Sequence, residues 1–241
     1  MIETVTILDI IRLLLGISIL SYASYTDIKT RQASNLLWVI MGSIGGILLI
    51  VQYFTIGFEN ILLLISIPVM IGFFYILFQF RLIFGGADAK ALMALAILVP
   101  LEPSIETFPM FEGLPIFAWT IFSNSVILFL LIPLSLLIFN IAKRNPEFPY
   151  CLLGYKMSIE KAKEKFVWPL EKLVDGKRKF MYMPKDFETE EELEEFEKNG
   201  IKEIWVTPKI PFMIPLLAGF IVSFIFGDLL FHLIGLIKSA I

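Results

Sequence analysis

Two aspartates that lie far apart in the sequence stand beside long apolar runs. Asp88 ends the stretch Gly-Gly-Ala-Asp at 85–88, just before an apolar run, and Asp27 follows the first apolar run of the chain. A carboxylate at the end of a membrane helix costs free energy, and such residues usually have a partner or a function. Two carboxylates held close together share a proton, since both cannot ionise easily. Such a pair can hydrolyse a peptide bond, one Asp activating water and the other donating to the carbonyl oxygen.

The same two residues also have a simpler interpretation as hydrated helix-end carboxylates. Acidic residues are common at helix ends, and Asp88 could cap the N-terminus of the helix that follows it. The residues before it favour a site, because Gly85 and Gly86 allow another backbone or a ligand to approach closely. Spacing alone leaves both interpretations open.

The apolar content indicates a membrane protein. The 241 residues are 57% apolar, against about 45–50% for a soluble domain. A helix that crosses a bilayer needs about 20 largely apolar residues, and six runs meet or approach this length. They are 5–25, 35–54, 59–80, 88–101, 116–141 and 211–237. We therefore predict an all-α polytopic bundle of six transmembrane helices. The first run carries acids at its start, so we interpret it as an uncleaved span.

The short loops give the orientation of this bundle. Lys29 and Arg31 follow the first run, and Arg81 and Lys90 flank the junction of the third and fourth, whereas loop 102–115 has only acids. Because basic residues concentrate in cytoplasmic loops, we predict a multi-pass protein of the cell membrane with its N-terminus outside. Asp27 and Asp88 then share the cytoplasmic face. We interpret these basic residues as setting topology rather than binding lipid phosphate.

A polar segment divides the apolar chain into domains. Segment 142–210 has equal numbers of basic and acidic residues, and we expect it to be a small cytoplasmic α+β insert. Its pattern predicts a helix from Thr189 to Asn199-Gly200. It also predicts strands at 166–168, 180–183 and 201–207, with a turn at Asp175-Gly176 between the flanks of the first two. The predicted domains are 1–141, 142–210 and 211–241, the last being the sixth span.

Composition excludes several kinds of site. One cysteine, Cys151, and one histidine, His232, cannot make a disulfide framework, a CxxC zinc site or a His-rich metal site. We expect no metal and no cofactor. A net charge of −3 gives no sign of nucleic-acid binding. Near the outer ends of the first and last spans, the pairs Asp9/Arg12 and Asp228/His232 have helical spacing and are expected to be local structural pairs.

Two motifs resemble a known family. The stretch at 85–88 is similar to the GxGD motif of intramembrane aspartyl proteases, with Ala87 in place of the second glycine. The segment 27–35 is similar to the part of type IV prepilin peptidases in which an Asp ends a helix, basic residues follow and an Asn opens the next span. Six spans with a polar insert before the last resemble the archaeal preflagellin peptidases. The resemblance implies that Asp27 and Asp88 are catalytic and that Gly85, Gly86 and Ala87 shape the substrate channel.

The resemblance also implies an activity and a partner. The expected enzyme is a membrane-embedded aspartic endopeptidase that acts at the cytoplasmic face of the bilayer. Its substrate would be a preflagellin or prepilin-like precursor, with a short basic leader before an apolar helix that stays in the membrane. With one cysteine, the four-cysteine zinc domain of the bacterial enzymes is missing, so we expect no methyl transfer. Two alternatives remain: a proton- or cation-coupled transporter that uses the Asp pair, and a non-catalytic scaffold of a filament assembly machine.

Overall fold

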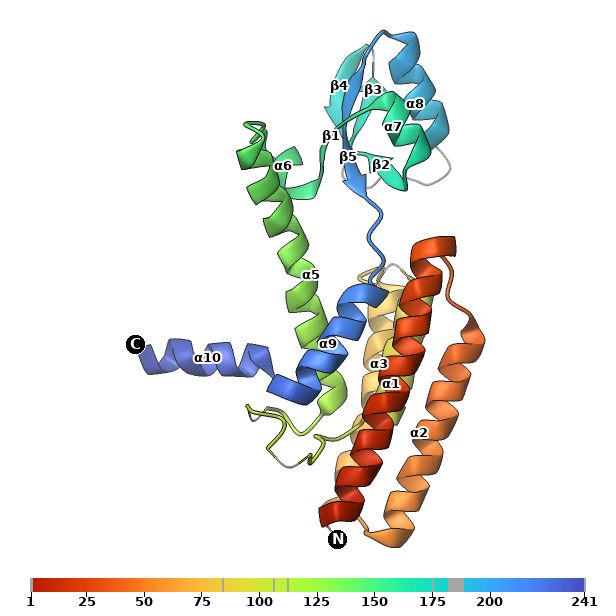
Figure 1. The fold of residues 1–241 in the computed structure, drawn as a ribbon, viewed down its shortest axis with the longest axis vertical. Helices are drawn as coiled ribbons and strands as arrows, with labels where there is room; N and C mark the ends of the chain where they lie inside the picture. Colours follow the sequence, from red (N-terminus) through yellow and green to blue (C-terminus); the bar gives the residue numbers. More distant parts are fainter. Residues whose placement is uncertain are drawn as a thin grey trace. The chain divides into compact units, whose positions relative to one another are not determined.

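The structure is a computed structural model, and it describes residues 2–83, 85–105, 107–111, 113–174, 176–181 and 189–240. The chain divides into two compact units (Figure 1). The first joins residues 1–129 with 211–241, and the second covers 130–210. The polar segment therefore falls in the second unit, which begins within a long helix.

Helices make up the first unit, together with the start of α5, which ends in the second. They are α1 (Ile2–Thr30), α2 (Asn35–Thr55), the 3-10 helix η1 (Ile61–Ile65), α3 (Ser66–Gln79), α4 (Gly86–Leu98), α5 (Phe117–Ala142), α9 (Met213–Phe226) and α10 (Leu229–Ala240). Among the described residues, four segments are long and apolar enough to cross a membrane. These are Thr4–Thr30, Asn35–Thr55, Ile61–Gln79 and Phe117–Ala142.

The expected six spans are therefore not confirmed, and two of the six runs differ from expectation. At about 1.5 Å per residue, the 13 residues of α4 reach about 20 Å, short of the roughly 30 Å hydrocarbon core. The run 211–237 is not one helix. It breaks at Gly227, where φ is +80°, and so forms α9 and α10.

The short helix α4 lies at the centre of the first unit. It packs against α2 and α3, whereas α1 packs against α9 and α2. Most of its side chains are buried, among them Leu92, Leu95 and Leu98. A glycine permits the close approach to α2, since a Cβ at Gly45 would lie 2.7 Å from the Cα of Leu98. This burial on several sides explains how a helix too short to span the bilayer can belong to the bundle.

The second unit contains the strands and the remaining helices. Its elements are α6 (Tyr150–Leu153), β1 (Tyr155–Ser158), α7 (Ile159–Glu164), β2 (Val167–Pro169), β3 (Glu171–Val174), β4 (Lys177–Phe180), α8 (Thr189–Lys198) and β5 (Glu203–Pro208). One antiparallel sheet has the order β1-β5-β2, and β3 pairs with β4 in a separate hairpin. Leu193 and Phe196 of α8 share a buried cluster with Val206 of β5.

The predicted helix and two of the three predicted strands are confirmed, whereas the third strand and the strand pairing need correction. The helix begins at Thr189 and is followed by Gly200 at φ +72°. The strand expected at 180–183 instead ends at Phe180, and Tyr182 and Met183 lie outside the described residues, as does Asp175. The predicted pairing of 166–168 with 180–183 was wrong. The hairpin is formed by 171–174 and 177–180, because a short turn joins the residues directly beside it, and β2 pairs with β5.

Candidate active site

Asp27 lies in the last turn of α1, and a tight link follows it. The N–H of Arg31 donates to the C=O of Asp27 at 3.0 Å, and Arg31 has φ +56°, the left-handed conformation that commonly ends a helix. Ser34 then begins α2, because its hydroxyl accepts the N–H of Leu36 at 3.3 Å. The direction of the chain between Asp27 and α2 is thus set by the four residues from Arg31 to Ser34.

Asp88 lies in the first turn of α4. Gly85 is the residue before that helix and takes an extended conformation. The carboxylate of Asp88 folds back over it, so a Cβ at Gly85 would lie 2.1 Å from Oδ2. A carboxylate is favourable at a helix N-terminus because of the helix dipole. Ala87 is already helical and needs no positive φ, which explains how alanine fits the second glycine position of the motif.

One open cleft of about 380 Å³ brings these two helix ends together. It is lined by Asp27, Arg31, Gln32, Ala33, Gly85, Gly86, Ala87 and Asp88. All five residues singled out from the sequence therefore line the same cleft. Sequence reasoning assigned no site role to Gln32 and Ala33, and it treated Arg31 as a topology signal. Their position directly after Asp27 was the available clue.

A hydrogen bond beside the cleft joins α4 to the start of α2. The ammonium group of Lys90, in α4, donates to the side-chain oxygen of Asn35, at the start of α2, at 2.8 Å. Both residues are exposed. Lys90 therefore connects the helix of Asp88 to the segment that follows Asp27, in addition to any role in topology.

Comparison with known proteins identifies the region that holds this cleft. Residues 14–141 match the model of the type IV leader peptidase family. This match covers more than half of the chain and includes every residue that lines the cleft. The chain belongs to the type IV leader peptidase family. The resemblance noted in the sequence is thereby confirmed, and the chain is a peptidase. Residues 146–229 of this leader peptidase match a second model, described as Archaeal Peptidase A24 C-terminus Type II.

Three curated relatives align with nearly the whole leader peptidase, and each is named preflagellin peptidase. The protein from Methanococcus voltae is 29% identical over 91% of this chain and 97% of its own. The relative from Methanocaldococcus jannaschii is 27% identical over 95% and 98%. That from Methanococcus maripaludis is 28% identical over 90% and 96%.

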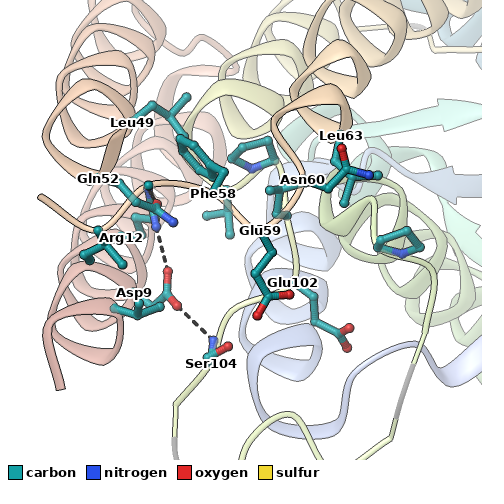
Figure 2. Close-up of a pocket in the computed structure, with 17 residues that line it drawn as sticks. Asp9, Arg12, Leu49, Gln52, Phe58, Glu59, Asn60, Leu63, Glu102 and Ser104 are labelled. Atoms are coloured by element: carbon teal, nitrogen blue, oxygen red, sulfur yellow. Dashed lines mark hydrogen bonds and ion pairs between the residues drawn. The ribbon is translucent and has the colours of Figure 1, made fainter. Parts of the chain in front are cut away.

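A second cavity, of about 570 Å³, lies at the other ends of α1 and α2 in the leader peptidase (Figure 2). The guanidinium of Arg12 donates to Asp9 and to Gln52, each at 2.7 Å, and Asp9 also accepts the N–H of Ser104 at 2.9 Å. Asp9 and Arg12 are each only 4% exposed. The expected local pair is confirmed, and it also ties α1 to α2 and to the loop after α4.

The prediction that Asp228 and His232 form a local pair was wrong. Asp228 accepts the N–H of Phe231 at 3.0 Å, and the ring of His232 stacks on Phe111 at 3.8 Å between centroids. The reason is the break at Gly227. It places Asp228 just before a new helix, where a short carboxylate caps free N–H groups rather than facing the residue one turn on.

Proposed function

We propose that this leader peptidase is an aspartic endopeptidase that removes the leader from a preflagellin or prepilin-like precursor. The observation that carries the proposal is the shared cleft. Asp27 and Asp88 come from different helices and line one open cavity, within the region matched to the family. The names of the three relatives support preflagellin as the substrate.

The proposed reaction needs only these two carboxyl groups and water. The ionised Asp takes a proton from water as the water oxygen bonds to the scissile carbonyl carbon. The protonated Asp donates its proton to the carbonyl oxygen. When the tetrahedral intermediate collapses, the C–N bond breaks, the amine leaves with the proton held by the first Asp, and the second Asp recovers its own. We leave open which Asp takes which part, because a coupled pair shares its proton.

The first turn of α4 suits the approach of an extended substrate. Gly85, Gly86 and Ala87 all line the cleft, and their small size leaves the backbone accessible beside Asp88. We propose that the scissile peptide lies along this turn, with the leader in the cytoplasm and the apolar helix of the substrate in the bilayer. The basic short loops on the side of Asp27 and Asp88 support the cytoplasmic placement.

Cleavage by membranes that contain single variants tests this proposal. A preprotein with a short basic leader and an apolar helix is mixed with wild type, Asp27→Asn or Asp88→Asn, and processing is followed by gel shift. Both variants should lose cleavage by at least about 10³-fold, as expected when a catalytic group is removed. Glu59→Gln is the control, because Glu59 is an exposed acid outside the cleft, and it should cleave normally.

The possible outcomes separate the candidate functions. Full cleavage by either aspartate variant, at equal amounts of folded protein, would mean that Asp27 and Asp88 are helix-end acids. Absence of cleavage by the wild type, with a substrate that a curated relative processes in parallel, would favour the transporter or the scaffold.

A further inference from the structure

The chain changes direction at Gly227, in a turn that is held by specific backbone contacts. Gly227 has φ +80°, and a Cβ there would lie 2.0 Å from the carbonyl oxygen of Phe111. The N–H groups of Met110 and Phe111 donate to the carbonyls of Ile225 and Phe226 at 3.1 and 2.9 Å. Because no other residue fits this conformation and this contact, the direction of α10 relative to α9 is fixed by the fold.

A buried side chain completes the turn. Asn124 of α5 is fully buried, and its amide donates to the carbonyl of Gly227 at 2.8 Å and to the hydroxyl of Ser223 at 2.9 Å. Its oxygen accepts the N–H of Leu229 at 3.1 Å. Asp228 is 1% exposed and caps α10. The end of α9 and the start of α10 are thus satisfied by protein groups, which lets the backbone bend without exposing polar groups to lipid.

Helix α10 has two different faces. At 100° per residue, one arc holds six aliphatic residues and the opposite arc holds most of the polar and small ones. The aliphatic arc is Leu229, Leu230, Leu233, Ile234, Leu236 and Ile237, and the opposite arc is Phe231, His232, Gly235, Lys238 and Ser239. Every residue from 233 to 239 is exposed, with Leu236 at 52% and Ile237 at 60%. Within the described chain, Leu229 is partly covered, and the other five residues of the aliphatic arc are exposed.

We propose that α10 lies in the plane of the bilayer interface, with its aliphatic arc among the acyl chains and its polar arc at the headgroups. Its 12 residues reach about 18 Å, too short to cross a hydrocarbon core of roughly 30 Å. An interfacial helix buries an apolar face at the acyl boundary and keeps a polar face at the headgroups, and the two arcs of α10, with Lys238 on the polar one, match this division. In Figure 1, α10 leaves the end of α9 at a wide angle and points away from α1 and α2.

Lipid is the occupant that the neighbouring surface favours. Ile225 and Phe226, in the last turn of α9, are 37% and 39% exposed, so apolar surface continues from α9 onto α10. The exposed side chains of the spanning helix α2, such as Ile50 at 58%, must face lipid in the same way. A stable protein interface uses roughly 20–30 residues a side, whereas the aliphatic arc offers six.

Spin-label accessibility in vesicles tests this placement with the full chain. Single cysteines at 233 and 237 report the aliphatic arc, and those at 235 and 239 report the polar arc. All are made in a Cys151→Ser background, which removes the free, buried thiol of the chain so that only the introduced cysteine can be labelled. Each nitroxide is exposed to oxygen, which enters lipid, and to a nickel chelate, which stays in water. The vesicles are phosphatidylcholine with a minority of phosphatidylglycerol. Labels at Ile50 and Lys177, in separate variants, provide the lipid and water references.

The expected result is an alternation. The ratio of oxygen to nickel accessibility should be several-fold higher at 233 and 237 than at 235 and 239, with the helical period. A high ratio at all four positions would mean a spanning helix, and nickel access at all four would mean a helix in water. Spin–spin broadening at 233 and 237, with both reagents excluded, would mean that a second copy covers the arc. Each of these three results would overturn the proposal.

Discussion

At Gly85, the carboxylate of Asp88 occupies the space in which a side chain would begin. An added methyl group would lie 2.1 Å from Oδ2 and 2.8 Å from Cγ. A carboxylate can rotate, so Gly85→Ala should displace Asp88 rather than unfold α4. A shift of about 1 Å in a catalytic group can cost about 10²-fold in rate, and we expect a loss of that order in kcat with an unchanged melting temperature.

The neighbouring glycine is the matched control for this prediction. A Cβ at Gly86 would meet only the ring of Phe78, at 3.7 Å, which is ordinary van der Waals contact. Gly86→Ala should therefore leave the Asp88 carboxylate in place, and any rise in its KM reports crowding of the substrate. Normal turnover by Gly85→Ala would show that the observed position of the Asp88 carboxylate is not needed for cleavage.

The Asp9–Arg12 pair allows a stability prediction at the residue scale. Arg12→Met would leave the carboxylate of Asp9 buried without its cation, and breaking a buried pair costs about 3–5 kcal/mol. Adding Asp9→Asn should recover part of this loss, because the uncompensated charge is removed. Chemical unfolding in detergent micelles would measure both variants.

An exposed pair provides the comparison. Lys198 and Glu194 contact each other at 3.4 Å with 76% and 60% of their side chains exposed, and Lys198→Met should cost under about 1 kcal/mol. If Arg12→Met were equally mild, the network would carry little of the stability of the bundle.

At the scale of elements, the break between α9 and α10 depends on a contact that no local pattern contains. Asn124 and Gly227 are 103 residues apart in sequence. Asn124→Leu would leave the carbonyl of Gly227 and the N–H of Leu229 without their partner. Since each buried unsatisfied group costs about 1–3 kcal/mol, we expect a loss of at least about 2 kcal/mol in unfolding free energy.

Asn199 offers a control for that measurement. It makes one side-chain bond, to the carbonyl of Glu195 at 2.8 Å, and is exposed, so Asn199→Ala should change stability by under about 1 kcal/mol. Equal stabilities of Asn124→Leu and wild type would mean that water or lipid headgroups satisfy the turn instead.

The elements divide into those that local pattern determines and those that it does not. Long apolar runs predicted α1, α2 and α5, and the turn residues predicted a strand-containing insert with a helix at Thr189. Run length alone could not reveal that 211–237 is two helices. Gly227-Asp228 is in retrospect a stop followed by a cap. Strand pairing failed for a related reason, because β2 and β5 meet through tertiary packing.

At the scale of the whole molecule, the candidate site joins two groups of helices. Asp27 belongs to α1, which packs against α9 and α2, and Asp88 belongs to α4, which packs against α2 and α3. Topology alone predicted that both acids reach one membrane face, and motif resemblance selected five residues that all line one cleft. The sequence could not reveal the hydrogen bond between Lys90 and Asn35, because these residues are 55 positions apart.

That link distinguishes two roles for Lys90. If Lys90 only sets topology, Lys90→Met and Lys29→Met should alter the fraction of correctly inserted enzyme and leave the kcat of the inserted enzyme unchanged. If its bond to Asn35 positions α4, Lys90→Met should lower kcat several-fold, with little change in stability because both partners are exposed. Lys29→Met is the control, since Lys29 lies over the ring of Tyr25 within its own helix, α1. We expect the second result, measured as turnover per molecule of enzyme whose insertion is verified by labelling from one side of the membrane. Equal kcat values for the two variants would return Lys90 to the topological role that its loop position first suggested.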